Sequence, residues 1–301
     1  MKLTTMLSFF RNSVAYFALS VLWLLHWLPL PLLRGVGCLL GRMAFHFALA
    51  RREIARVNLR LCFPEMEEAE RERLLRQHFI IFAQSMLDRA LLWWASTARL
   101  ARLLEIRGWE HVVRSDQQPT LLLAPHFAGL DAGGVAGAMR VSGVSVYSRQ
   151  KRQPVFDQMI LRGRTRFNQQ ILISRKEGMR RAMKAMKQGL PFYYLPDMDL
   201  GRKESIFVPF FGVPAATVPG VSRLVRATRA KVVPVITRMT AKGYTVDFLP
   251  PWENFPGESV EADTRFMNQF IEECVKTMPE QYHWLHKRFK TRPLGEAGFY
   301  A

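Results

Sequence analysis

The order of apolar and polar positions predicts strands and helices that alternate along most of the chain. Short apolar runs bounded by glycine or proline are typical of buried strands, and they occupy residues 120–124, 144–147, 192–195, 232–236 and 244–249. Helical periodicity lies between or around them, at residues 65–94, 135–140, 154–167 and 260–278. This alternation predicts an α/β fold in which helices cover a mostly parallel central sheet.

The N-terminal part has a different pattern, because it is apolar over a length that fits a membrane. Residues 12–33 carry no charged side chain, and these 22 residues compare with the roughly 20 that a bilayer core requires. A cleaved signal peptide and a buried core helix are the alternatives. No small-residue cleavage site precedes Arg34, which favours an uncleaved membrane-anchoring helix. A second apolar segment extends to residue 50, and four arginines then follow within ten residues, as is typical of a cytoplasmic junction that faces anionic lipid.

The excess of positive charge in the sequence indicates what kind of partner the protein binds. The formal net charge is +18, so the expected partners are anionic. Residues 149–187 hold twelve Lys or Arg and two acids, a local net charge of +10. This run lacks the interleaved aromatic residues of a single-strand nucleic-acid platform, so we predict no nucleic-acid partner. The three cysteines have neither metal-ligand nor redox spacing and are typical of reduced, mostly buried residues.

The strongest candidate chemistry follows the apolar run that Pro125 closes. His126 comes directly after it, and Asp131 comes five residues later. Ligands of open α/β sheets bind where strands end, and a neutral imidazole whose tautomer a carboxylate fixes is a general base. The pair requires His126 in the loop and Asp131 in the first helical turn, since five residues apart lie on different faces of a continuous helix. Taken alone, the two residues also fit a turn histidine and a helix cap.

Three further groups of residues are candidates. Arg164 and Arg166 suit phosphate contact, because a guanidinium grips phosphate in a forked geometry. Asp197 and Asp199 follow a predicted strand, and either line a substrate site or belong to a hairpin turn. No further acid or histidine cluster accompanies them, so we predict no metal. The aromatic segment 207–212 fits an acyl-chain groove and plain core packing about equally.

These motifs together resemble the lipid A late acyltransferases, the lauroyl- and myristoyl-type enzymes of bacteria with an outer membrane. That family is related to the glycerolipid acyltransferase superfamily, whose signature His-x4-Asp matches His126 and Asp131. The matching segments are Arg51-Arg52, 58–64, Val146-Tyr-Ser-Arg149, Gly163-Arg-Thr-Arg166, Pro196-Asp-Met-Asp199, 207–212, 281–284 and 288–293. They run over nearly the whole chain in the family's order. Met198 and Leu200 depart from the family, which usually has a polar residue and an aromatic there.

The resemblance implies an O-acyltransferase that moves a fatty acyl group from acyl carrier protein to a hydroxyl on an acyl chain of a phosphorylated, Kdo-bearing lipid A precursor. It implies no cofactor, and a place at the bacterial inner membrane with the catalytic domain on the cytoplasmic face. We expect residues 1–50 to form the membrane anchor and interfacial segment, and residues 51–301 to form the acyltransferase domain. The expected catalytic residues are His126 as base and Asp131 as its orienting carboxylate. The expected substrate-binding residues are Arg149, Arg164, Arg166, Asp197 and Asp199.

Two alternatives remain open at this point. One is a glycerolipid acyltransferase that acts on lysophosphatidic acid, which shares His-x4-Asp but fits the flanking motifs poorly. The other is a non-catalytic, membrane-associated protein that binds anions through its basic run.

Overall fold

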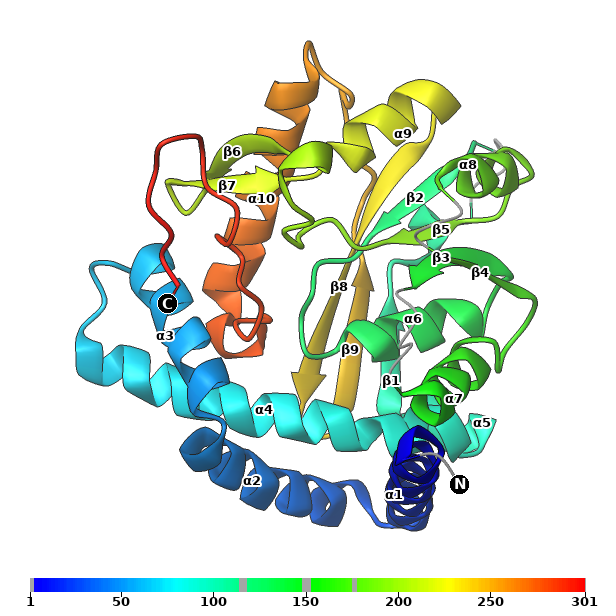
Figure 1. The fold of residues 1–301 in the computed structure, drawn as a ribbon. Coiled ribbons are helices and arrows are strands. Elements are labelled where there is room, and N and C mark those ends of the chain that lie inside the picture. The colour runs from blue at the N-terminus through cyan, green and yellow to red at the C-terminus, as the bar shows by residue number, and fades with distance from the viewer. Residues whose placement is uncertain (1–2, 114–117, 148–152, 175–177, 301) are drawn as a thin grey trace.

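A seven-stranded sheet forms the centre of the computed structural model, which describes residues 3–113, 118–147, 153–174 and 178–300 (Figure 1). The strand order is β1-β9-β8-β2-β5-β3-β4, and only the β8–β9 pairing is antiparallel. The strands are β1 (Leu104–Arg107), β2 (Thr120–Leu123), β3 (Gly143–Tyr147), β4 (Gln170–Ser174), β5 (Phe192–Tyr194), β8 (Lys231–Thr240) and β9 (Gly243–Phe248). The predicted mostly parallel α/β sheet is confirmed.

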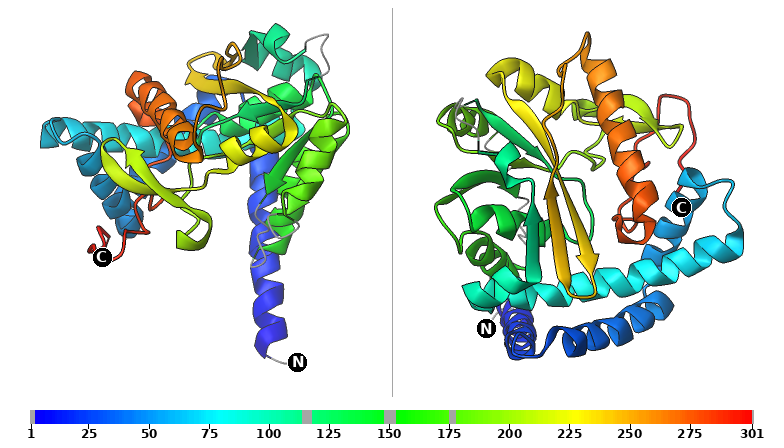
Figure 2. Two further views of the ribbon diagram at one scale, coloured as in Figure 1. Left: turned by 90° about the horizontal axis from the view of Figure 1, so that it is seen from above. Right: turned by 180° about the vertical axis from the view of Figure 1, so that it is seen from behind.

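Helices cover both faces of this sheet (Figures 1 and 2). They are α1 (Leu3–Leu25), α2 (Leu30–Phe47), α3 (Leu49–Cys62), α4 (Glu68–Trp94), α5 (Thr97–Leu103), α6 (Leu130–Ala138), α7 (Pro154–Arg164), α8 (Arg180–Lys187), α9 (Gly220–Thr228) and α10 (Val260–Thr277). A separate hairpin joins β6 (Ile206–Phe210) to β7 (Val213–Thr217).

The two-sided cover explains the unbroken apolar run of β2. Leu121 and Leu123 belong to a core cluster that includes residues of α8, α9 and α10. Leu122 belongs to the second cluster, with residues of α4 and α6. Since successive strand side chains point to opposite faces, a strand buried on both sides favours apolar residues at successive positions.

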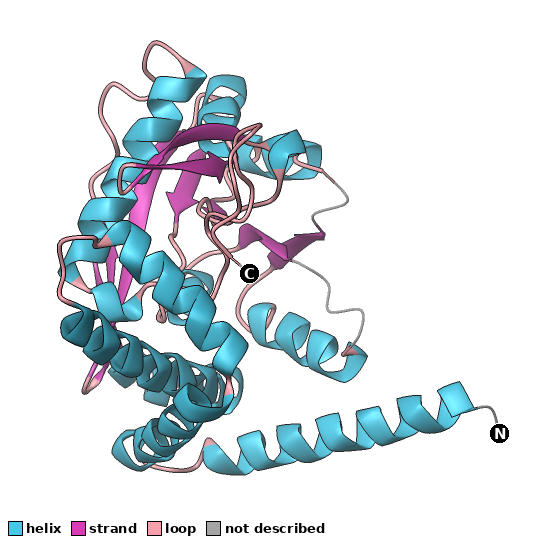
Figure 3. Ribbon diagram, turned by 60° about the vertical axis from the view of Figure 1, so that its left-hand side comes forward, coloured by secondary structure: helices cyan, strands magenta, loops and turns pink. Residues whose placement is uncertain are grey.

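The apolar run predicted over residues 12–33 is divided between two helices. α1 ends at Leu25 and α2 begins at Leu30, with Pro29 as its N-cap residue. The break fits the sequence, because a proline lacks the N–H that would continue a helix and disfavours helical backbone at the residue before it. α1 projects from the rest of the molecule (Figures 2 and 3).

Within the described residues, no single helix has both the length and the apolar character needed to cross a membrane. α2 and α3 reach that length together but are bent by 89°. The single anchoring helix predicted over residues 12–33 is thus two helices here, and membrane anchoring by them stays a prediction.

α2 packs closely along α4 (Figure 1). A Cβ atom on Gly41 would lie 2.5 Å from the Cα of Ile80, so only glycine permits this approach. At the start of α2, the Arg34 Nη2 atom lies 2.9 Å from Asp88 Oδ2, which also accepts a 2.7 Å hydrogen bond from the Tyr244 hydroxyl. Arg34, predicted to bracket a membrane run, is instead buried against the domain.

Candidate active site

His126 and Asp197 meet because β2 and β5 are neighbouring parallel strands. Leu123 pairs with Tyr194 at the ends of the two strands, so the segments that follow leave the sheet at the same edge. His126 Nδ1 lies 2.6 Å from Asp197 Oδ1. The backbone N–H of His126 donates to Asp197 Oδ2 at 3.0 Å. Asp197 is 2% exposed, and each of its two carboxylate oxygens contacts His126 in the protein interior.

This contact fixes the protonation pattern of the imidazole. An ionised carboxylate only accepts hydrogen bonds, so Nδ1 of neutral His126 carries the proton and Nε2 carries the lone pair. Burial alone would raise the pKa of Asp197, but the neighbouring His126 outweighs it and lowers the pKa to about 2. Asp197 therefore stays ionised at neutral pH and stabilises a positive charge on the ring.

Asp131 has a different environment in the first turn of α6. Its Oδ2 accepts a 2.7 Å hydrogen bond from Arg89 Nε, and its Oδ1 lies 3.4 Å from Arg164 Nη2. Burial would raise the pKa of Asp131, but these two guanidinium groups lower it to about 2. The prediction that Asp131 orients His126 is corrected here, because the strand end after β5 delivers Asp197 to Nδ1 while α6 turns Asp131 toward α4 and α7. A catalytic role for Asp131 stays a prediction.

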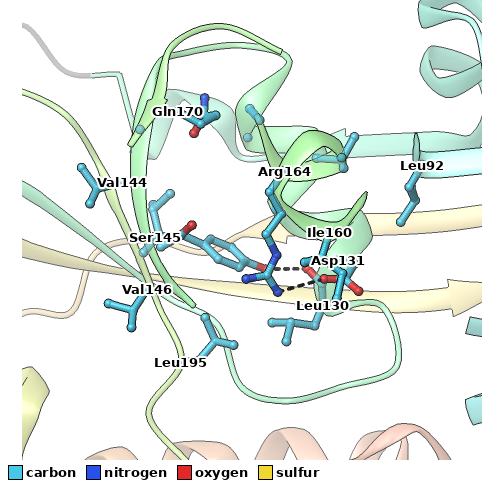
Figure 4. A pocket seen from close by; sticks show the side chains of 18 of the residues that line it. Leu92, Leu130, Asp131, Val144, Ser145, Val146, Ile160, Arg164, Gln170 and Leu195 are labelled. Atoms are coloured by element: carbon cyan, nitrogen blue, oxygen red, sulfur yellow. Dashed lines mark hydrogen bonds and ion pairs between the residues drawn. The ribbon is translucent and has the colours of Figure 1, made fainter. Parts of the chain in front are cut away.

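An apolar cavity opens beside these charged groups, between α4, α6, α7 and the strands β3 and β5 (Figure 4). It encloses about 990 Å³ of empty space, part of it open to solvent. Arg89, Asp131 and Arg164 form its polar part, and most of the remaining lining is apolar or glycine. The lining residues Leu130 and Leu195 lie four residues after His126 and two before Asp197. The segments that carry His126 and Asp197 therefore also contribute residues to the cavity lining.

The family model of the bacterial lipid A biosynthesis acyltransferases matches residues 1–291. The chain belongs to this family. It is 37% identical over 299 residues to the lipid A biosynthesis lauroyltransferase of Escherichia coli, covering 98% of this chain and 97% of the relative. It is 32% identical to the palmitoleoyltransferase of the same bacterium, covering 96% and 95%. The myristoyltransferase of that bacterium is 33% identical, covering 85% and 80%.

Among solved structures, the 1-acyl-sn-glycerophosphate acyltransferase PlsC from Thermotoga maritima matches with a TM-score of 0.37 and 15% identity. That match covers 83% of this chain and 99% of the solved chain.

Arg166, predicted to bind substrate in this lipid A acyltransferase, instead holds the end of a helix. Its Nη1 donates to the carbonyl oxygen of Leu92 at 3.1 Å, and its Nη2 donates to that of Ala95. The last carbonyl groups of α4 have no partners within the helix, so the guanidinium satisfies them. Its predicted substrate contact stays a prediction beside this structural role.

Asp199 is likewise occupied by the chain itself. Its Oδ1 accepts from the N–H of Gly201 at 2.9 Å and from the Thr291 hydroxyl at 2.8 Å. Its Oδ2 accepts from the N–H of Thr291 at 2.7 Å. The carboxylate fastens the C-terminal segment next to the site. Asp197 contacts His126. The substrate contacts predicted for both aspartates stay predictions. Arg149 lies outside the described residues.

Two histidines near His126 had no role in the sequence prediction. The His283 ring lies 6.3 Å from the His126 ring, and the N–H of His283 donates to the His126 carbonyl oxygen at 3.0 Å. Burial, followed by the effect of His126, lowers the pKa of His283 to about 3. Burial, followed by the charge of Arg288, lowers that of His286 to about 4. Both rings are neutral at neutral pH, so neither repels a proton that His126 accepts.

Arg89 was also missed, since a single arginine within a helical pattern carries no signal of its position. The aromatic segment 207–212 belongs to the core rather than to the cavity, because Phe210 is fully buried in a core cluster. Across the ranges that the structure describes, no three His, Cys, Asp or Glu side chains are grouped as metal ligands would be.

Proposed function

We propose that this acyltransferase moves a fatty acyl group from its thioester on acyl carrier protein to a hydroxyl on an acyl chain of a phosphorylated, Kdo-bearing lipid A precursor. Membership of the family gives the reaction class. The donor and the acceptor come from the resemblance of the motifs. The observation that carries the mechanism is the hydrogen bond between His126 and the buried Asp197, beside a cavity with an apolar lining.

The proposed step is a direct transfer. His126 Nε2 takes the proton from the acceptor hydroxyl as its oxygen attacks the thioester carbonyl. The new ester forms, the C–S bond breaks, and the imidazolium returns the proton to the departing thiol. Asp197 stabilises the imidazolium meanwhile, and no acyl-enzyme is needed.

Arg164 is the group best placed to meet negative charge. Its side chain is 33% exposed, lines the cavity and is held by Asp131 (Figure 4). A guanidinium that is fixed before the reaction stabilises a developing oxyanion or a substrate phosphate without reorganising. In this proposal Asp131 acts through Arg164, and the cavity holds the acyl chain of the donor.

The N-terminal helices support a place at the inner membrane, with the site on the cytoplasmic face. Within the part of the chain whose side chains are described, all but four of the exposed large hydrophobic residues fall between Val14 and Leu49. Soluble monomers rarely expose so much apolar surface in one region. We propose that α1 and the outer side of α2 bind the lipid surface. Sedimentation with anionic vesicles tests this, and a variant with Asp at Phe17, Trp27 and Phe47 that still sediments at high salt would contradict it.

Transfer from labelled acyl carrier protein to the purified lipid A precursor tests the reaction. His126→Ala should reduce turnover by at least about a thousandfold, because the base is lost. His46→Ala, which changes an exposed histidine away from the site, is the matched control and should keep its activity. Equal loss in both variants, or transfer to lysophosphatidic acid in preference to the lipid A precursor, would contradict the proposal.

A further inference from the structure

Gly137 lines the apolar cavity and has room for a side chain that it lacks. A Cβ atom built on Gly137 would meet no atom within 4 Å, and its backbone is not in the left-handed region. Neither backbone geometry nor close packing therefore accounts for a glycine at this position of α6.

Two other glycines near the cavity have an evident steric reason, whereas a Cβ atom on Gly134 would make only an ordinary 3.7 Å contact with the Tyr193 ring. A Cβ atom on Gly133 would lie 2.3 Å from the Thr237 hydroxyl oxygen. One on Gly163 would lie 2.2 Å from the Trp93 ring. Those positions exclude larger residues because the elements pack closely there. At Gly137, which lines the cavity, no neighbouring atom excludes a side chain.

The direction of α6 places Gly137 far along the cavity from the charged groups. The helix begins near the C-terminal end of β2, where His126 lies. The chain then returns along the sheet and enters β3 at the opposite end of the strands. Gly137 follows Asp131 by six residues, which is about 9 Å along a helix. Val141 and Gln170 line the same inner part, and the Gln170 side chain donates to the Val141 carbonyl oxygen at 2.8 Å. Figure 4 shows Gln170 on the side away from Asp131.

We propose that Gly137 determines the length of the acyl chain that the cavity accepts, an inference that rests on the proposed binding of the donor chain there. Each buried methylene group strengthens binding about fourfold. A side chain at position 137 would occupy the space of the last methylene groups of a long chain. The preferred donor would then become shorter, while chains that end before Gly137 would bind as before.

The test measures the affinity of saturated fatty acids, from decanoic to stearic acid, for the full chain in detergent by calorimetry. In the wild type, affinity should rise with length up to a limit. In Gly137→Leu that limit should move to a shorter acid, and the longest acid that the wild type binds well should lose roughly tenfold or more in affinity. Gly298→Leu is the matched control, because Gly298 has nothing within 4 Å of an added Cβ atom and lies outside both the cavity and the N-terminal helices.

An unchanged length limit in Gly137→Leu, or the same shift in Gly298→Leu, would overturn the inference. Gly137→Ala carries the test if the leucine variant does not fold, and should show a smaller shift in the same direction. Competition between acyl carrier protein donors of different length should then move the products toward shorter chains. Because the calorimetry needs no turnover, a shift in the length limit without any transfer to lipid A would support Gly137 and count only against the proposed acceptor.

Discussion

Two carboxylates near the site differ in burial and in the charged groups that surround them. Asp197 follows β5, is 2% exposed and faces the imidazole of His126. Asp131 begins α6, has a side chain that is 26% exposed, and lies between two guanidinium groups. Both pKa values are about 2, yet a histidine lowers one and arginines lower the other.

The difference separates two tasks that the His-x4-Asp pattern assigns to a single pair of residues. The buried carboxylate controls the proton of the base. The carboxylate at the cavity controls the position of Arg164, and through it the positive charge that meets the substrate. We therefore expect the two aspartates to fail in different ways when they are changed.

The largest expected effect follows from removing the charge of Asp197. Asp197→Asn should lower kcat by about a thousandfold to ten-thousandfold, because the amide neither fixes the tautomer nor stabilises the imidazolium. Asp131→Asn should lower it by about a hundredfold or less. Steady-state kinetics of both variants under one set of conditions measures the ratio. A greater loss in Asp131→Asn would restore the pairing that the sequence suggested.

Arg164 sharpens the comparison from the other partner. Arg164→Ala should lower turnover by about a hundredfold, as expected when a preorganised donor is removed. Arg164→Lys should recover little of it, because the forked geometry is lost. If Arg164 only attracted anions over a distance, the defect would be a raised KM that shrinks with added salt. Rates at low and high salt, with one substrate varied at a time, distinguish the two cases.

The pH dependence of stability should also differ between the two carboxylates. A carboxyl group whose pKa is lowered from 3.8 to about 2 by folding stabilises the protein above pH 3.8, and that stability is lost as the pH falls through about 2. For Asp197 this amounts to on the order of 2 kcal/mol. Asp131 should contribute less, because water screens its more exposed pairs. The free energy of unfolding, measured with urea between about pH 5 and pH 2, should therefore change less with pH in Asp197→Asn than in Asp131→Asn.

The strands and main helices were predictable because they depend on local pattern. The apolar run at 120–124 reads as a strand buried on both faces, and β2 occupies Thr120–Leu123. β1 and β4 were not predicted, since Leu104–Arg107 has exposed polar positions and Gln170–Ser174 is an edge strand that pairs only with β3. The uncharged, apolar composition of the N-terminal run predicts one helix, and the prediction gives too little weight to Pro29 and Pro31, where the structure has a break.

The partner of His126 was not predictable from spacing. Asp197 lies 71 residues away in the chain, and only the register of β2 against β5 brings it to Nδ1. A contact between residues close in sequence, such as His126 and Asp131, is easier to predict than one that depends on how two strands pair in a sheet. The same limit applies to Arg166, whose partners are backbone groups, and to Asp199, which binds backbone groups and the Thr291 hydroxyl; no motif indicates these partners.

The smallest expected effect concerns Arg166, two residues after Arg164 and yet directed away from the cavity. Arg166→Ala leaves the carbonyl oxygens of Leu92 and Ala95 without their donor, so the free energy of unfolding should fall by about 1 kcal/mol. Because the guanidinium caps α4 and does not line the cavity, kcat and KM should stay near the wild-type values at a temperature where both proteins are folded. Urea unfolding and steady-state kinetics on Arg166→Ala, with Arg164→Ala as the matched variant, measure both effects. A turnover defect in Arg166→Ala as large as that in Arg164→Ala would mean that the whole Gly-Arg-Thr-Arg element contacts the substrate, as its motif first suggested.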